Sequence, residues 1–172
     1  MIEASIMFAP LHTVARHNDP RWNHSGRTLY EQKAIRFMPG VTEIPLLVDH
    51  DESQQVGVVD LLYRLEWTDG PWMVASATVH EPPPWLRKED TKASFSFIAL
   101  WRGSFTACEH VMDAFVREVS ILSPGTEPAE PLARVLRLAP VDEPPNRTPA
   151  REVIYGGGII RRPGIGQVLR VR

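Results

Sequence analysis

Much of the chain alternates branched or aromatic residues with polar ones at a period of two, which is the pattern of β-strands. Six segments carry this pattern, and prolines, glycines and acidic residues separate them. The predicted strands are Ile2–Ala9, Val41–Asp49, Val56–Trp67, Trp72–His80, Lys92–Leu100 and Phe115–Leu122. The residues Thr68-Asp69-Gly70-Pro71 favour a turn, so the third and fourth strands are expected to form a hairpin.

Helical spacing of apolar residues is less common along the chain. It predicts a helix over Glu127–Leu138, and the segment Pro83–Glu89 is expected to form a second, short one. Glu109–Arg117 fits a helix or a strand. These patterns indicate a mainly β (α+β) fold, a small barrel-like β core with a few packed helices.

The last 35 residues differ in composition from the rest of the chain. They hold five prolines, five glycines and six arginines but three acidic residues, so they are net +3 and the first 137 residues are net −5. Pro140–Pro149 has too few apolar residues to order itself. We therefore expect a folded domain at residues 1–137 and a flexible Pro/Gly/Arg-rich tail at 138–172. Within this tail, Val153–Tyr155 and Val168–Val171 are expected to form short strands or a partner-binding peptide.

The composition excludes several classes of protein. With 172 residues, 43% hydrophobic, and a net charge of −2, the chain fits one globular domain and not a general nucleic-acid binder. No apolar run approaches the roughly 18–20 residues that span a bilayer, and the N-terminus lacks the pattern of a secretory signal. The single cysteine, Cys108, excludes an internal disulfide. The spacing of His12, His17 and His24 favours a solvated loop over a zinc site.

Three of the predicted strands each carry one chemically useful group. His50 continues the apolar face of its strand at the strand's end, and Ser94 and Ser96 alternate with two phenylalanines. Glu118 is flanked on its face by Val116 and Ser120, and a carboxylate among apolar neighbours needs a partner. A hydroxyl, an imidazole and a group that orients the imidazole form the set used in serine acyl transfer. The alternative from the pattern alone is ordinary strand serines and a histidine in a capped surface turn.

Three segments, in this order, resemble the tailed-phage prohead proteases, the capsid-maturation serine peptidases distantly related to the herpesvirus assemblins. Ile44–Asp51, followed by Val56–Val59, resembles the family's apolar run into a histidine with a glycine and a branched strand after it. Ala93–Phe97 resembles the strand that carries the nucleophile. Arg117–Gly125 resembles the Glu-Val-Ser-aliphatic strand that runs into a turn, and Glu127–Leu136 resembles the closing helix. The resemblance covers roughly residues 40–137 and implies a β-barrel-like core surrounded by helices.

The resemblance also implies roles for individual residues. His50 corresponds to the general base, Ser94 to the nucleophile and Glu118 to the third member of the triad. Assemblins use a second histidine as the third member, so His80 is the alternative to Glu118. Ser96 stands where the family often has glycine, and of the two serines Ser94 is the preferred nucleophile.

The implied activity is that of a serine endopeptidase that cleaves the scaffold or major capsid protein during prohead maturation, and also itself. Backbone N–H groups, with Arg117 as a candidate helper, would stabilise the oxyanion. No metal or organic cofactor is required, and neither nucleic acid nor membrane is an expected partner. The expected location is the host cytoplasm, inside the assembling prohead, and self-association is left open. The alternative is a catalytically inactive capsid assembly or scaffold protein that retains the protease fold.

Overall fold

The computed structural model describes residues 1–11, 14–16, 27–31, 33–88, 90–105, 108–141, 151–155 and 158–162. The regular structure of these residues is β, and no helix occurs among them. The strands are β1 (Ile2–Pro10), β2 (Val14–Arg16), β3 (Arg27–Tyr30), β4 (Ile35–Arg36), β5 (Ile44–Val48), β6 (Asp51–Trp67), β7 (Gly70–Val79), β8 (Ala93–Phe105), β9 (Cys108–Ile121), β10 (Arg134–Pro140), β11 (Arg151–Tyr155) and β12 (Gly158–Arg162).

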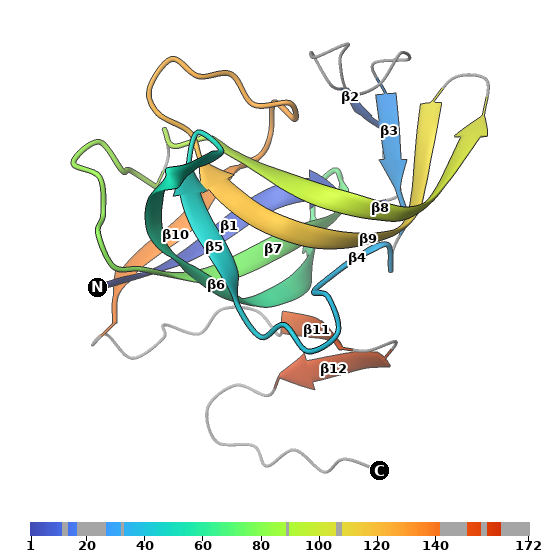
Figure 1. Ribbon diagram of the computed structural model, residues 1–172, viewed down its shortest axis with the longest axis horizontal. Helices are drawn as coiled ribbons and strands as arrows, with labels where there is room; N and C mark the ends of the chain where they lie inside the picture. Colours follow the sequence, from blue (N-terminus) through green and yellow to red (C-terminus); the bar gives the residue numbers. More distant parts are fainter. Residues whose placement is uncertain are drawn as a thin grey trace.

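The fold is mainly β, with the strands joined in one mixed sheet. Its main path runs β10-β1-β7-β6-β5-β9-β3-β2, and β4 and β8 also pair with β9. Strands β3, β4 and β5 run parallel to β9, and the other pairs are antiparallel. The long β8–β9 hairpin lies across β1 and β7 (Figure 1). An isolated bridge between Lys92 and Arg134 links the start of β8 to the start of β10.

The main hydrophobic core lies where the β8–β9 hairpin crosses β1. The ring of Phe8 in β1 lies 4.8 Å from that of Phe95 in β8, centroid to centroid, and Tyr30 lies 5.7 Å from Phe95. A second, smaller cluster includes Met7 and Trp72, which are also buried. Because Met7 and Phe8 point to opposite faces of β1, this part of the sheet is covered on both sides.

All six predicted strands are present, and the predicted hairpin is confirmed. Trp67 of β6 pairs with Gly70 of β7, so Thr68 and Asp69 form the tip of a tight turn. Gly70 has a φ of 125°, a conformation that glycine adopts without the steric cost of a Cβ atom. The ambiguous segment Glu109–Arg117 is strand, within β9.

Both predicted helices are wrong. The described part of Pro83–Glu89 forms turns and irregular chain, and the segment begins within a run of three consecutive prolines. In Glu127–Leu138 the first seven residues are irregular, and the rest lies in β10, which pairs with β1. Pro128 and Pro131 lack the N–H groups of a helix and disfavour helical geometry in the residues before them. Pairing along β1 then satisfies the backbone of the extended segment that follows.

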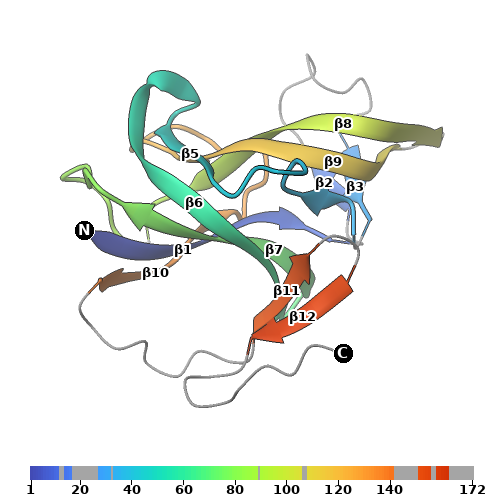
Figure 2. The same cartoon turned by 60° about the horizontal axis from the view of Figure 1, so that its bottom comes forward.

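The C-terminal part of the sheet extends beyond the expected domain boundary. Strand β10 continues to Pro140, which pairs with Ile2, so residues 138–140 belong to the sheet. Strands β11 and β12 form a hairpin, and β11 pairs with β6 through Val153 and Tyr63 (Figure 2). Val153–Tyr155 therefore lies in a strand, whereas Val168–Val171 lies outside the described residues.

Candidate active site

His50 is presented by a two-residue turn between β5 and β6. Val48 pairs with Asp51, which leaves Asp49 and His50 at the tip, with φ values of 51° and 62°. Positive φ at both central residues is typical of a type I′ hairpin, where asparagine and glycine are the usual residues. Left-handed geometry at non-glycine residues costs on the order of 1–3 kcal/mol each and persists where the surroundings enforce it. The expectation that His50 continues the strand face is thus wrong, because β5 ends at Val48 and the chain reverses.

The end of β9 holds this turn in place. The Asp49 N–H donates to the Ile121 carbonyl oxygen at 3.1 Å. The Asp49 carboxylate accepts bonds from the Ser123 N–H at 2.9 Å and the Ser123 hydroxyl at 2.5 Å. The His50 N–H donates to Ser120 Oγ at 3.1 Å. These four bonds explain how the chain maintains its unfavourable turn geometry.

A β-bulge turns Glu118 onto the polar face of β9. Ser96 of β8 pairs with Glu118 but the next residue, Phe97, pairs with Val116, so Arg117 is the extra residue. Val116 belongs to the core, and the expectation that it shares a face with Glu118 is wrong. A bulge changes which side of the sheet a residue faces, and bulges are common next to active sites. A strict period of two cannot anticipate this change.

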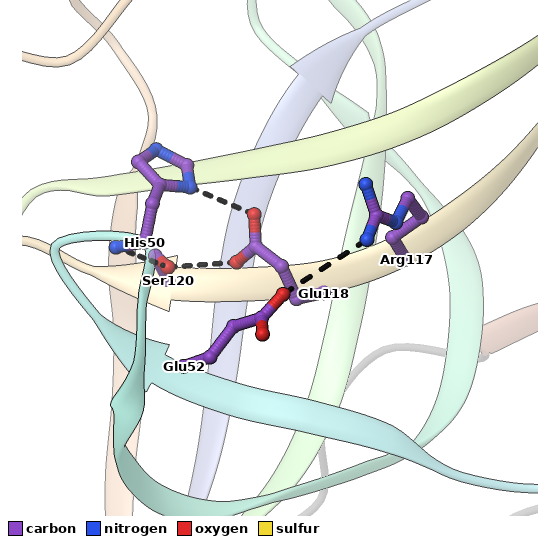
Figure 3. A network of polar contacts seen from close by, with 5 residues as sticks. All are labelled: His50, Glu52, Arg117, Glu118 and Ser120. Carbon is purple, nitrogen blue, oxygen red and sulfur yellow. Dashed lines mark hydrogen bonds and ion pairs between the residues drawn. The ribbon is translucent and has the colours of Figure 1, made fainter.

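The structure brings His50 and Glu118 into direct contact (Figure 3). The His50 Nδ1 lies 2.7 Å from Glu118 Oε1, and the Ser120 hydroxyl donates to Glu118 Oε2 at 2.7 Å. The side chain of Glu118 is 9% exposed and that of His50 is 42% exposed. A buried carboxylate thus accepts hydrogen bonds at both oxygens and faces an imidazole that solvent reaches.

The contact shifts the pKa of both groups. The hydrogen bond to Glu118 raises the pKa of His50 above its ordinary value, outweighing the lowering effect of burial. Burial alone would raise the pKa of Glu118. The hydrogen bonds from His50 and Ser120, the charge of His50 and a smaller contribution from the Ser96 hydroxyl together lower it below its ordinary value. The arrangement therefore favours an ionised Glu118 beside a protonated His50.

The two candidate nucleophiles lie on the same face of the sheet as Glu118. Ser94 pairs with Ser120, and Ser96 pairs with Glu118, across neighbouring antiparallel strands. Side chains directly opposite each other in such a pair have Cβ atoms about 4.5–5.5 Å apart. Within the described part of the chain, no hydrogen bond joins Ser94 to His50. The structure thus joins His50 to Glu118 and places Ser94 opposite Ser120, the residue bonded to both of them.

His80, the alternative orienting residue, lies elsewhere. It follows β7, is exposed, and donates its backbone N–H to the Val56 carbonyl oxygen at 2.9 Å. No contact between the side chains of His80 and His50 occurs in the described ranges. Arg117, the candidate oxyanion helper, forms an exposed ion pair with Glu52 at 3.9 Å (Figure 3).

The described residues contain no group of three or more His, Cys, Asp or Glu side chains arranged to hold a metal ion. His12, His17 and His24 lie outside the described residues, and nothing tests the loop predicted for them. The described part of the chain contains no helix long and apolar enough to cross a membrane.

Gly57, part of the segment after His50, has a structural reason to be glycine. It lies between β5 and β7, where it pairs with Leu46 on one side and Val79 on the other. A Cβ atom added at this position would clash with the Thr78 carbonyl oxygen. The close approach of the two backbones thus requires glycine and positions the hairpin that carries His50.

The raised pKa of His50 leads to a first prediction. In an NMR titration, the ring protons of His50 are expected to titrate above the ordinary histidine value of about 6.5. Glu118→Gln should move the midpoint back toward that value. Because the folded-state pKa of His50 is the higher one, the stability that His50 contributes is complete below about pH 6.5 and is lost as pH rises through the raised pKa. The contribution of Glu118, whose pKa is lowered, is lost instead as pH falls through that lowered pKa. An unshifted midpoint in the wild-type protein would contradict the His50–Glu118 bond.

Chemically, this arrangement resembles the base and orienting group of a hydrolase. When Nδ1–H donates to Glu118, the lone pair of the neutral imidazole is on Nε2, the nitrogen that accepts a proton in acyl transfer. Sequence reasoning did not assign a role to Ser120, although its position two residues after Glu118 places both side chains on one strand face. No family model, curated protein or solved structure matches this chain.

Proposed function

We propose that this protein is a serine endopeptidase of the prohead-protease type, which cleaves the scaffold or the major capsid protein during capsid maturation, and also itself. The observation that carries the proposal is the 2.7 Å contact between His50 Nδ1 and the buried Glu118 carboxylate. A carboxylate in this position fixes the histidine tautomer that acts as a base. The substrate class is taken from the prohead proteases, which three segments of this chain resemble in the same order along the sequence.

In the proposed reaction, Ser94 Oγ attacks the scissile carbonyl carbon while His50 Nε2 takes the hydroxyl proton. Glu118 stabilises the imidazolium that forms, and His50 then returns the proton to the leaving amine. A water molecule attacks the resulting acyl-enzyme, again with His50 as the base, and releases the acid product and free Ser94. No metal or organic cofactor is part of this proposal.

The sheet topology supports the barrel-like core that the family resemblance implies. The main path ends at β10 on one side, and β8 lies at an edge beyond β9. The bridge between Lys92 and Arg134, and the bond from the Ala93 N–H to the Ala133 carbonyl oxygen, connect these two ends. A barrel requires contact between the two ends of its sheet, so these links support the proposed barrel-like core.

A second candidate function is an inactive capsid assembly protein with the same fold. The observation that favours it is the lack of a hydrogen bond between Ser94 and His50 in the residues that the structure describes. Catalytic hydrogen bonds are often long before substrate binds and tighten in the reactive complex, so we favour the peptidase.

Co-expression with a tailed-phage major capsid protein and its scaffold distinguishes the two functions. The wild-type chain is expected to produce discrete cleavage products, detected by mass spectrometry of the intact proteins, and His50→Ala is expected to produce none. Assembly of capsid shells with uncleaved subunits by the wild-type chain would favour the assembly protein and contradict the peptidase.

A further inference from the structure

Ser120 connects the two residues that form the base and its orienting group. It lies on β9 two residues after Glu118 and is 0% exposed. Its oxygen accepts the His50 backbone N–H at 3.1 Å, and its hydroxyl donates to Glu118 Oε2 at 2.7 Å. One side chain therefore fixes the backbone of His50 and the carboxylate orientation of Glu118 (Figure 3).

The hydrogen bond from the His50 N–H to Ser120 matters more for the position of His50 than it would for a residue within a strand, whose backbone is fixed by pairing. His50 is at the tip of a turn, with a φ of 62°, and its imidazole is only partly buried. The neighbouring residue, Asp49, is held separately by Ile121 and Ser123. Ser120 holds the backbone of His50 itself, at the residue whose side chain must reach Glu118.

Ser120 is not itself a candidate nucleophile. A hydroxyl has one proton to donate, and in Ser120 that proton bonds to Glu118. The residue is also fully buried, so a substrate carbonyl cannot approach its oxygen. Its two hydrogen bonds, to the His50 N–H and to the Glu118 carboxylate, are those of a buried residue that orients other groups of the site.

We infer that Ser120 is a positioning residue, which couples His50 to Glu118 and maintains the imidazole in the orientation that accepts the proton of Ser94. This inference rests on the proposed peptidase function. Without the hydroxyl, Glu118 loses a hydrogen-bond donor and the His50 N–H loses its acceptor. The Nδ1–Glu118 bond then forms in a smaller fraction of molecules, although every reacting group is still present.

Three variants of the full chain test the inference. Ser120→Ala removes both bonds, Ser120→Thr retains a hydroxyl, and Ser53→Ala is the matched control. The Ser53 hydroxyl bonds to Asp51 on the same hairpin, is exposed, and touches neither His50 nor Glu118. Two quantities are measured: the pKa of the His50 ring by NMR, and kcat and KM for the cleavage described above.

In Ser120→Ala, the pKa of His50 is expected to fall toward its ordinary value of about 6.5. We expect kcat to fall about 10- to 100-fold, which is the usual loss when a residue that orients a metal-binding side chain is removed. KM should remain within about twofold, because Ser120 does not touch substrate. Ser120→Thr should recover most of both values, and Ser53→Ala should resemble the wild type.

The NMR measurement separates the inference from the proposed function. A folded Ser120→Ala protein with an unchanged His50 pKa overturns the inference, whether or not the chain cleaves anything. A lowered pKa without cleavage by the wild type supports the coupling but overturns the peptidase. If Ser120→Ala does not fold, Ser120→Cys, which has nearly the same shape and a weaker donor, replaces it and is judged by the same two results.

Discussion

Ser94→Ala is expected to abolish cleavage of the capsid substrate and of the chain itself, while the domain remains folded. Removing the nucleophile of a serine peptidase costs on the order of 10⁶-fold in kcat, because no other group forms the acyl intermediate. Ser94 is partly exposed, and its hydroxyl forms no side-chain hydrogen bond among the residues that the structure describes, so the loss of this hydroxyl should have little effect on stability. The measurements are cleavage on co-expression and thermal unfolding of the purified variant.

Ser96→Ala is the matched control for this variant, since the two serines lie on the same face of β8. Ser96 is opposite Glu118 and makes a small contribution to lowering its pKa. We expect Ser96→Ala to retain most of the cleavage activity. Cleavage that persists in Ser94→Ala and disappears in Ser96→Ala would identify Ser96 as the nucleophile instead.

Glu118→Gln is expected to slow cleavage on the order of 10⁴-fold without unfolding the domain. Glutamine has the same shape, but it is neutral and its amide has one oxygen acceptor instead of two. It cannot stabilise the imidazolium as a carboxylate does, nor accept bonds from both His50 and Ser120 at separate oxygens. Single-turnover cleavage and circular dichroism of the purified variant measure the two parts of this prediction.

His80→Ala is the control for the alternative third member and is expected to have little effect, because His80 is exposed and apart from His50. A strong loss in His80→Ala with a mild loss in Glu118→Gln would indicate a Ser–His–His triad, as in the assemblins. Mild losses in both would indicate a Ser–His dyad. Either result would make Glu118 a structural residue.

Local chemistry along the sequence predicted much of the sheet. The β6–β7 hairpin follows from Asp69 and Gly70 between two runs with β propensity, and the structure confirms it. The helix predicted over Glu127–Leu138 is wrong because Pro128 and Pro131 disfavour a helix more strongly than the spacing of a few apolar residues favours one. Pairing with the edge of β1 is a tertiary effect, which a local window does not include.

The candidate site was predictable in part. A carboxylate at Glu118 required a partner, and the contact with His50 is present. The route by which they meet was not predictable, because it depends on a left-handed turn at Asp49 and His50 and on a bulge at Arg117. Both features change the direction of a side chain without changing the alternation of residue types. Ser120 was missed because the alternation places it on a face but does not show what it contacts.

Covalent labelling of the active serine is the most direct test of the proposed triad of Ser94, His50 and Glu118. A fluorophosphonate probe forms a covalent bond with a serine hydroxyl that an adjacent base has activated, and peptide mass spectrometry then locates the adduct. The proposed triad predicts a single adduct on Ser94 in the wild type, a large loss of labelling in His50→Ala, and slower labelling in Glu118→Gln. An adduct on Ser96 or another serine, or equal labelling of wild type and His50→Ala, would contradict it.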